Sequence, residues 1–283
     1  MRFLLPLLCA AALQAQSQAP SRPKAFSILR ATLHQFEDGQ VMPPGFVWTP
    51  GATVQLNFFA AGFKTSPKDE VKVSYRVDAF DPQGVPLMPA ITGTVEVELA
   101  EEDRKSDWVP KMHAAVPLPP LAETGSYKIV MQAKDEIAQV EARYETPFPV
   151  RGRNVEASPT LVMRNFRYVR DEFDRTPMSE PVFKAGDAVW ARFEITGYKL
   201  GPANRVDVEY GLAVIGPDGK VLYTEPKAAT DRDESFYPKK YVLGVLNVTT
   251  RPGTTAGEYA LLVTVRDNIG GQTYEEKRPF RLE

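Results

Sequence analysis

The sequence predicts an all-β protein made of two antiparallel β-sandwiches in tandem, and three observations lead to this prediction. Apolar and polar residues alternate over many short stretches, which is the pattern of half-buried strands rather than of helices. The chain contains 25 prolines, and proline disfavours long helices. A pattern of glycines, aromatic residues and aspartates occurs once in each half of the chain. The 283 residues are enough for two domains of ordinary size.

The expected strands of the first half follow one another at short intervals with turn residues between them. The alternating stretches cover residues 26–33, 54–58, 71–77, 95–99, 112–118, 125–135 and 140–150. The sequence Asp81-Pro82-Gln83-Gly84 between two of them is typical of a β-turn. Seven short strands without a helical period are typical of an antiparallel sandwich.

The strand that organises each half begins with a glycine turn and a tyrosine and ends with an aspartate. The two copies cover Gly125–Asp135 and Gly257–Asp267. The residues expected to face the core are Tyr127, Ile129, Met131 and Ala133 in the earlier copy and Tyr259, Leu261, Val263 and Val265 in the later copy. This arrangement resembles strand F of bacterial immunoglobulin-like domains, where a tyrosine near the strand start anchors a corner. The resemblance is to a broad class and implies an immunoglobulin-like sandwich in each half.

The repetition extends over most of both halves at two nearly constant offsets. Gly51 and Gly186 lie 135 positions apart, whereas Gly125 and Gly257 lie 132 positions apart. Other matched pairs are Trp48 with Phe183, Val54 with Val189, Phe58 with Phe193, Tyr75 with Tyr210, Asp135 with Asp267 and Phe148 with Phe280. Because the offset decreases along the chain, the first copy is slightly longer than the second, and we place its additional residues near 90–105. Two long units indicate a tandem pair rather than a solenoid.

The N-terminus has the composition of a secretory signal, with Arg2, a short apolar run over residues 3–13 and small residues after it. We therefore predict a signal peptide at 1–17, a sandwich domain at 24–150, a linker at 151–160 and a second sandwich domain at 161–283. The only cysteine, Cys9, lies in the apolar run and follows Leu8, which does not suit a lipoprotein signal. The mature chain would then form no disulfide, which is typical of a bacterial exported protein of this size.

The charge balance and the residue types argue against several functions. Lysine and arginine number 34 and aspartate and glutamate 36, so no strong basic field would attract nucleic acid. No stretch after the N-terminus has a membrane-spanning length of apolar residues. The two histidines, His34 and His113, have no evident partner in the sequence, and His113 is expected to be a solvated strand residue. The nucleophile-elbow, phosphate-loop and dinucleotide motifs are absent.

Acidic residues cluster in three places, and each cluster contains a basic residue. The clusters contain Glu96, Glu98, Glu101, Glu102, Asp103 and Asp107; Asp171, Glu172 and Asp174; and Asp231, Asp233 and Glu234. Calcium favours oxygen-rich loops, but no cluster has the regular calcium-loop spacing. We interpret them as solvated charged loops, and the sequence leaves calcium binding open. It assigns no catalytic residue, no cofactor and no metal ligand.

Trp190 is a position at which the two copies disagree, because its counterpart in the repeat is Gln55. Val189 and Ala191 are expected to face the core, so Trp190 should face outward unless a bulge or an inverted register places it inside. The stretch Tyr241–Leu246 is apolar at both parities, so Leu243 and Val245 would also be exposed beside it. These three residues are the candidate partner-contact surface, because an exposed tryptophan on a sheet often marks a contact.

The sequence thus indicates a non-catalytic, exported binding or adhesion module, periplasmic or extracellular, that contacts a protein partner or a cell-envelope glycan. An alternative is a structural spacer or an assembly subunit of a larger exported complex. A hydrolase that uses two carboxylates across a cleft is a third possibility, but no carboxylate pair stands out in the sequence.

Overall fold

The computed structural model describes residues 25–37, 39–105 and 107–283, so the expected signal at 1–17, with Cys9, lies outside the described residues. Nearly all regular structure is β. The elements of the first half are β1 Ser27–His34, β2 Thr53–Ala61, β3 Glu70–Phe80, β4 Ile91–Glu98, α1 Glu101–Lys105, β5 Lys111–Pro117, β6 Gly125–Asp135 and β7 Val140–Val150. Those of the second half are β8 Val162–Val169, β9 Val182–Phe183, β10 Ala188–Thr196, the 3-10 turn Pro202–Asn204, β11 Val206–Ile215, β12 Val221–Asp233, β13 Val242–Thr249, β14 Gly257–Asp267 and β15 Gln272–Leu282.

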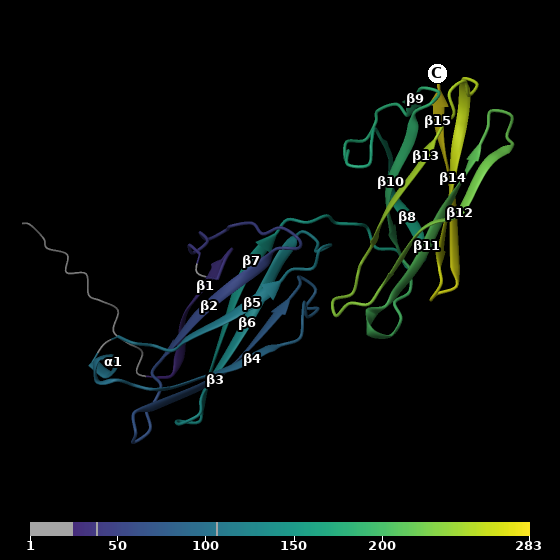
Figure 1. Cartoon of the computed structure of the whole chain (residues 1–283). Helices are drawn as coiled ribbons and strands as arrows, with labels where there is room; N and C mark the ends of the chain where they lie inside the picture. Colours follow the sequence, from purple (N-terminus) through teal and green to yellow (C-terminus); the bar gives the residue numbers. More distant parts are fainter. Residues whose placement is uncertain (1–24, 38, 106) are drawn as a thin grey trace, which may run out of the picture.

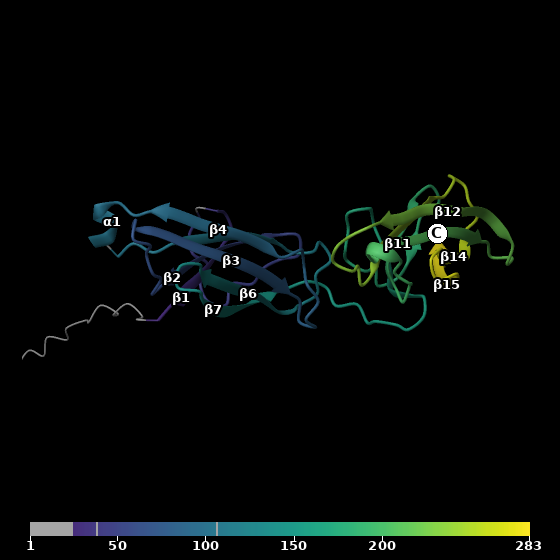
Figure 2. The same ribbon diagram turned by 90° about the horizontal axis from the view of Figure 1, so that it is seen from below.

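Each half forms two sheets that enclose one core, and the all-β prediction is confirmed. The first half has the strand orders β1-β2-β5 and β4-β3-β6-β7, and the second has β13-β10-β8 and β12-β11-β14-β15-β9. All strand pairs are antiparallel except β9 with β15. The two halves lie end to end, with β7 leading from the first half into the second (Figures 1 and 2).

The alternation read from the sequence places the core correctly. In β6 and β14 the residues expected to face inward are buried, from Tyr127 at 0% exposure to Tyr259 at 5%. Trp48 and Phe183, which the repeat matches, are both buried. Each forms a parallel bridge to the last strand of its half, Trp48 to Val150 and Phe183 to Leu282. Burial of these side chains stabilises the fold by roughly 1.5–3 kcal/mol for each large apolar residue.

Two features common to both halves explain why the matched polar residues are present. The hydroxyl groups of Tyr127 and Tyr259 donate to the carbonyl oxygens four residues earlier, those of Glu123 and Thr255. Asp135 is fully buried; its carboxylate accepts from the backbone N–H groups of Ile137 and Ala138 in the following turn.

The carboxylate of Asp267 makes the same turn contacts, with the N–H groups of Ile269 and Gly270. Each aspartate also accepts a bond from across the sandwich, Asp135 from Lys64 N at 2.7 Å and Asp267 from Lys199 N at 2.9 Å. Both aspartates therefore bond the following turn, as expected, and also fix the connection between the two sheets.

The change of offset between the two copies coincides with a difference between two equivalent connections, the one from β4 to β5 and the one from β12 to β13. The first connection, Leu99–Pro110, contains the short helix α1, whereas the second, Glu234–Tyr241, has no helix. The second is the shorter of the two and lies at the end of its half that faces the first half (Figure 1). This loop, residues 234–241, contacts the first half directly through Tyr237 and Lys240, and no pattern in the sequence predicts this contact.

Candidate functional site

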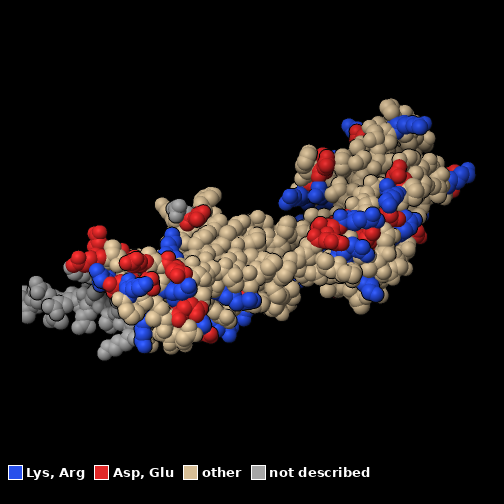
Figure 3. All heavy atoms as spheres, turned by 60° about the horizontal axis from the view of Figure 1, so that its bottom comes forward, with Lys and Arg blue, Asp and Glu red and all other residues tan. Residues whose placement is uncertain are grey.

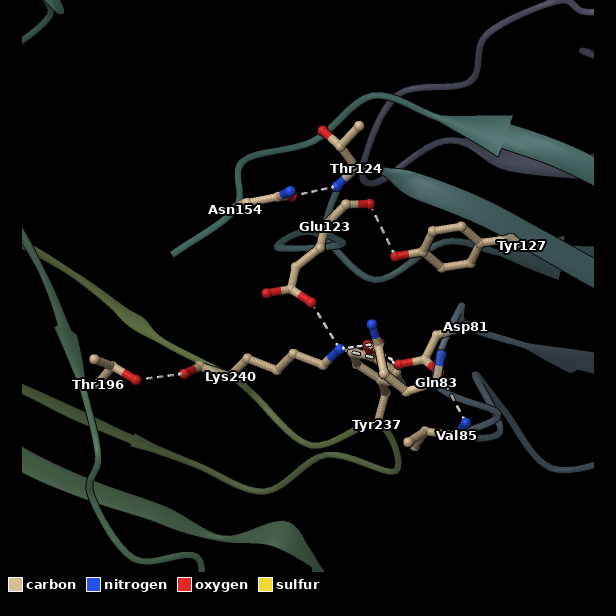
Figure 4. Close-up of polar contacts among 10 residues, drawn as sticks. All are labelled: Asp81, Gln83, Val85, Glu123, Thr124, Tyr127, Asn154, Thr196, Tyr237 and Lys240. Atoms are coloured by element: carbon tan, nitrogen blue, oxygen red, sulfur yellow. Dashed lines mark hydrogen bonds and ion pairs between the residues drawn. The ribbon is translucent and has the colours of Figure 1, made fainter. Parts of the chain in front are cut away.

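The site with the densest set of buried polar contacts lies where the two halves meet, and we call it the joint. It consists of Asp81, Gln83 and Glu123 from the first half and Tyr237 and Lys240 from the second (Figure 4). These residues are separated by up to 159 positions in the sequence. The turn before β4 and the turn before β6 carry the acceptors, and the loop at 234–241 carries the donors.

Lys240 is the centre of the joint. Its ammonium group donates to Gln83 Oε1 at 2.7 Å, Glu123 Oε2 at 2.8 Å and Asp81 Oδ2 at 3.1 Å. A lysine ammonium has three protons, so each of them has an acceptor. Figure 4 shows the side chain extended from the second half between the two carboxylates.

Asp81 is the buried partner, with a side chain that is 0% exposed. One carboxylate oxygen accepts from the N–H groups of Gln83 and Val85, and the other accepts from the Tyr237 hydroxyl at 2.9 Å and from Lys240. Burial alone would raise the pKa of Asp81, but these hydrogen bonds and the nearby ammonium lower it below its ordinary value. The carboxylate is therefore ionised in the folded protein near neutral pH.

The pKa values of the neighbouring groups shift as this arrangement requires. Burial would lower the pKa of Lys240, but hydrogen bonds and attraction from Glu123 and Asp81 raise it overall. Burial, and then the hydrogen bond to Asp81, raise the pKa of Tyr237, so its hydroxyl keeps the donated proton. Burial also raises the pKa of Tyr127 to about 12, and its hydroxyl holds the backbone of Glu123 in place.

The second half positions the donor loop through its own backbone contacts. The Tyr198 hydroxyl donates to the carbonyl oxygen of Lys239 at 2.7 Å, and Thr196 Oγ1 donates to that of Lys240 at 3.3 Å. Asn204 Nδ2 donates to the carbonyl oxygen of Phe236 at 2.7 Å. Because the loop is fixed on its own half, Lys240 approaches the first half from a defined direction.

The predicted linker adds a second set of contacts beside the joint. Thr124 donates its N–H to Asn154 Oδ1 and its hydroxyl to the carbonyl oxygen of Gly152, both at 2.8 Å. On the other side, the guanidinium of Arg153 donates to the carboxylate of Glu194, whose side chain is 0% exposed. Arg167 also approaches Glu194, at 3.4 Å. The segment thus bonds to both halves.

The predicted contact residues lie on one face, away from the core. Trp190 pairs with Asn247 across the β10–β13 ladder, and Arg192 pairs with Val245. Val189 and Ala191 are buried, so Trp190 is on the outer face, where it is half-buried. Leu243 is 43% exposed and Val245 half-buried on the same face of β13. The role of Trp190, Leu243 and Val245 in a contact stays a prediction.

The other polar residues considered in the sequence have local partners. His34 is buried, with ring nitrogens near the Gly39 carbonyl and the Thr32 hydroxyl, and His113 is half-buried beside Gln55 Oε1 at 2.9 Å. The expectation that His113 is solvated is therefore incomplete, because the Gln55 amide on the adjacent strand covers it.

Lysines pair with two of the acidic clusters: Lys72 lies 2.8 Å from Glu96 in the first, and Lys239 bonds to the one at 231–234. Lys239 lies 3.0 Å from carboxylate oxygens of both Asp231 and Asp233. Among residues 25–37, 39–105 and 107–283, no group of three potential metal ligands lies close enough to hold an ion. None of the helices in these ranges has the length and apolar character needed to cross a bilayer. On the face seen in Figure 3, positive and negative side chains lie mixed together on each half, and a largely uncharged surface lies between these two groups.

One feature of the repeat points to the joint. Asp81 and Glu123 have no carboxylate at their repeat counterparts, which are Gly216 and Thr255. Both carboxylates occur only in the first copy and lie in turns at the same end of the sandwich. This difference could have identified the end of the first half that receives a cation.

Comparisons with known proteins give a fold likeness only. No family model matches the sequence, and no curated protein matches it. Among solved structures, the chain is similar to the C-terminal domain of the Streptococcus agalactiae AgI/II polypeptide BspA, with 11% identity, a TM-score of 0.31 and coverage of 90% of this chain and 99% of that one.

It is also similar to the C-terminal domain of the Streptococcus pyogenes antigen I/II-family protein AspA, at 12% identity and a TM-score of 0.31, over 91% and 99% of the two chains. A family 123 glycoside hydrolase from Clostridium perfringens is similar over 44% of this chain and 27% of its own, at 14% identity and a TM-score of 0.30.

Proposed function

We propose that this chain is an exported, non-catalytic binding module made of two immunoglobulin-like domains, residues 24–150 and 161–283, joined by the linker 151–160. It contacts a protein partner or a cell-envelope glycan through the outer face of β10 and β13. One observation carries this proposal: the corresponding outer faces of the two halves differ in character. The second half exposes apolar side chains where the first half has a paired amide and imidazole.

The contrast rests on matched positions. Trp190 and Val245 on the second half correspond to Gln55 and His113 on the first, which are hydrogen-bonded to each other at 2.9 Å. Leu243, at 43% exposure, corresponds to the exposed Lys111. Apolar area left in water costs roughly 25 cal/mol per Å², so coverage of this face by a partner is favourable.

The proposal is tested by binding with purified protein that lacks residues 1–17. Immobilised wild type and Trp190→Ala would be incubated with an envelope extract and with an array of envelope glycans, and Gln55→Ala would serve as the matched control on the first half. We expect wild type and Gln55→Ala to retain the same partner and Trp190→Ala to lose at least tenfold in affinity. If wild type retains neither a protein nor a glycan, the proposed function is wrong.

A second candidate function, a structural spacer, is favoured by the joint. A spacer must hold its two units in a fixed relative orientation. The contacts of Lys240 and Arg153 provide two separate attachments that could do this. Small-angle scattering of wild type would then fit one rigid arrangement. A broad distribution of arrangements would argue against the spacer and leave the binding proposal unaffected.

The carboxylate hydrolase is not supported by the joint. Asp81 and Glu123 are both bonded to Lys240, and Asp81 already accepts four hydrogen bonds. A general acid or base must be able to exchange a proton with the substrate, whereas both of these carboxylates are bonded to the Lys240 ammonium. We therefore assign these residues to holding the two halves together.

A further inference from the structure

The free end of the second half contains an open apolar groove. It lies between the β11–β12 hairpin and the end of β13, and it has a volume of about 560 Å³. Its floor reaches the core residues Tyr259 and Phe280, and Leu222 and Tyr223 on one wall are 57% and 48% exposed. Two adjacent apolar side chains with this exposure are costly in water, which suggests that they are covered in use.

The repeat relates this groove to the surface of the first half at the joint. The offset of 135 residues matches Leu222 and Tyr223 to Leu87 and Met88. The offset of 132 residues matches Thr249, Thr250 and Arg251 to Pro117, Leu118 and Pro119. All five counterparts line a groove of about 380 Å³ at the joint. The two grooves are therefore the same part of the sandwich, once in each half.

In the first half a loop of the second half covers one side of this groove. The loop at 234–241 of the second half forms its other wall, through Phe236, Tyr237 and Pro238. Tyr237 is 8% exposed there and belongs to the core cluster of the first half. In the second half, all residues that line the groove belong to that half, and no loop from the described residues of the other half covers it. The structure thus contains two equivalent grooves: one is closed on one side by this loop and is called the filled socket below, and the other has no such loop in the described chain and is called the open socket.

We propose that the open groove of the second half is a docking site for a loop of a partner protein that presents an aromatic residue next to a carboxylate. This inference rests on the proposed function, since it gives the binding module a second contact surface, separate from the outer face of β10 and β13, and names the partner chemistry there. The aromatic residue would pack against Leu222 and Tyr223, as Tyr237 packs on the first half, and the carboxylate would pair with Arg251.

The preference for a carboxylate follows from the differences between the two sockets. The filled socket holds a lysine with Asp81 and Glu123, but the open socket has Gly216 and Thr255 at these positions. It has Arg251, an exposed residue, where the filled socket has Pro119. Arg251 forms no ion pair with any residue in the described part of the chain. The charge that the open socket accepts is therefore opposite to that of Lys240.

The test uses two synthetic peptides as probes of purified wild type. One has the sequence of the loop at 234–241, and the other has glutamate in place of both of its lysines. Amide chemical shifts would be followed by NMR during titration to millimolar peptide. We expect the glutamate peptide to shift the amides around Leu222, Tyr223 and Arg251 and to bind roughly two- to fivefold more tightly than the lysine peptide, as an exposed ion pair allows.

Variants separate the parts of the inference. Leu222→Asp should abolish these shifts, Arg251→Ala should remove the preference for the glutamate peptide, and Val140→Ala, an exposed position on the first half, should change neither. A thermal melt would verify that each variant is folded. The inference is overturned if neither peptide shifts the groove amides, if an envelope oligosaccharide shifts them and the peptides do not, or if Leu222→Asp abolishes a self-association of wild type.

Failure of this inference is distinguishable from failure of the proposed function. If the partner found with the Trp190 comparison binds normally to Leu222→Asp, and the peptides do not bind, then the binding module stands and the open socket is not its docking site. If no partner or glycan is retained by wild type, the proposed function fails whatever the peptides do.

Discussion

The two halves share their core and differ where each of them meets something else. Val54 and Val189, Phe58 and Phe193, and Tyr127 and Tyr259 are all buried at matched positions. At the end of the sandwich that receives a neighbour, however, Asp81 and Glu123 are replaced by Gly216 and Thr255. The positions that the two halves share are therefore those that pack the core, whereas the positions that differ include those that contact the neighbouring half.

The largest expected effect comes from breaking the joint on the side of the second half. Lys240→Met would leave Asp81 ionised and buried without its ammonium, and removal of one partner of a buried pair costs about 3–5 kcal/mol. Because Lys240 is 26% exposed and Asp81 keeps three other donors, we expect the lower end, about 3 kcal/mol, in the docking of the halves.

Calorimetry provides the measurement, with Lys239→Met as the matched control. The Lys239 ammonium bonds to Asp231 and Asp233 of its own half, so its loss should cost about 1 kcal/mol or less. We expect Lys240→Met to separate the unfolding of the two halves into two transitions and Lys239→Met to leave one. Equal behaviour of the two variants would mean that the joint does not couple the halves.

The joint should also be lost in acid, and the sign follows from the pKa of Asp81. Its folded pKa is lowered from 3.8, so its contribution is fully present above that value and decreases as the pH falls through the lowered pKa. The pKa of Lys240 is raised from 10.5, so its contribution persists below that value and is lost only at more alkaline pH. Between these limits the docking should be independent of pH.

Small-angle scattering against pH would detect the acid transition as an increase in the radius of gyration below about pH 4. In Lys240→Met the pKa of Asp81 should be closer to its ordinary value or above it, because the ammonium no longer lowers it. The same expansion should then begin at higher pH than in wild type. A transition in wild type near pH 6 would implicate a histidine and contradict the assignment to Asp81.

Most of the fold could be predicted from the sequence because its causes are local or repeated. Alternation fixed which residues of β6 and β14 face the core, and the duplicated glycine-tyrosine and aspartate positions fixed the equivalent strands. The short helix α1 was not predicted, although the change of offset marked its region. A helix of a single turn has no periodicity to detect.

The joint could not be predicted, because its contacts join residues up to 159 positions apart and depend on how the halves dock. Asp81 was interpreted as a turn residue, and it does bond the following turn, to Gln83 and Val85. Its second oxygen, which holds Tyr237 and Lys240, has no local signature. The alternation of Val189, Trp190 and Ala191 predicts that Trp190 points outward. It does not predict which residues or which partner the side chain contacts.

The two tyrosine corners offer a finer comparison of the halves. Tyr127→Phe and Tyr259→Phe each remove one hydroxyl that donates to a backbone carbonyl, at a cost of about 1.5 kcal/mol in the half concerned. Only Tyr127 bonds to the backbone of Glu123, which is a joint residue. We therefore expect Tyr127→Phe to weaken docking of the halves as well, measured by the same calorimetry.

If Tyr259→Phe separates the two unfolding transitions as much as Tyr127→Phe does, the position of the Glu123 backbone is irrelevant to the joint. The comparison is sharp because the two hydroxyls make the same contact in the same fold. A difference between the variants would then reflect the position of Tyr127 at the joint, where Glu123 accepts from Lys240 at 2.8 Å.

The smallest expected change in stability concerns the outer face that distinguishes the second half. Trp190→Ala removes a half-buried side chain from the surface of β10, and we expect it to cost about 1 kcal/mol of unfolding free energy, since only part of its apolar area leaves a protein environment. Phe193→Ala, on the same strand but the core face, removes a ring that is 1% exposed and should cost about 3–5 kcal/mol. Chemical denaturation of both variants gives the comparison directly. A loss near that of Phe193→Ala would show that Trp190 is a structural residue, and the apolar outer face would then need no partner to explain it.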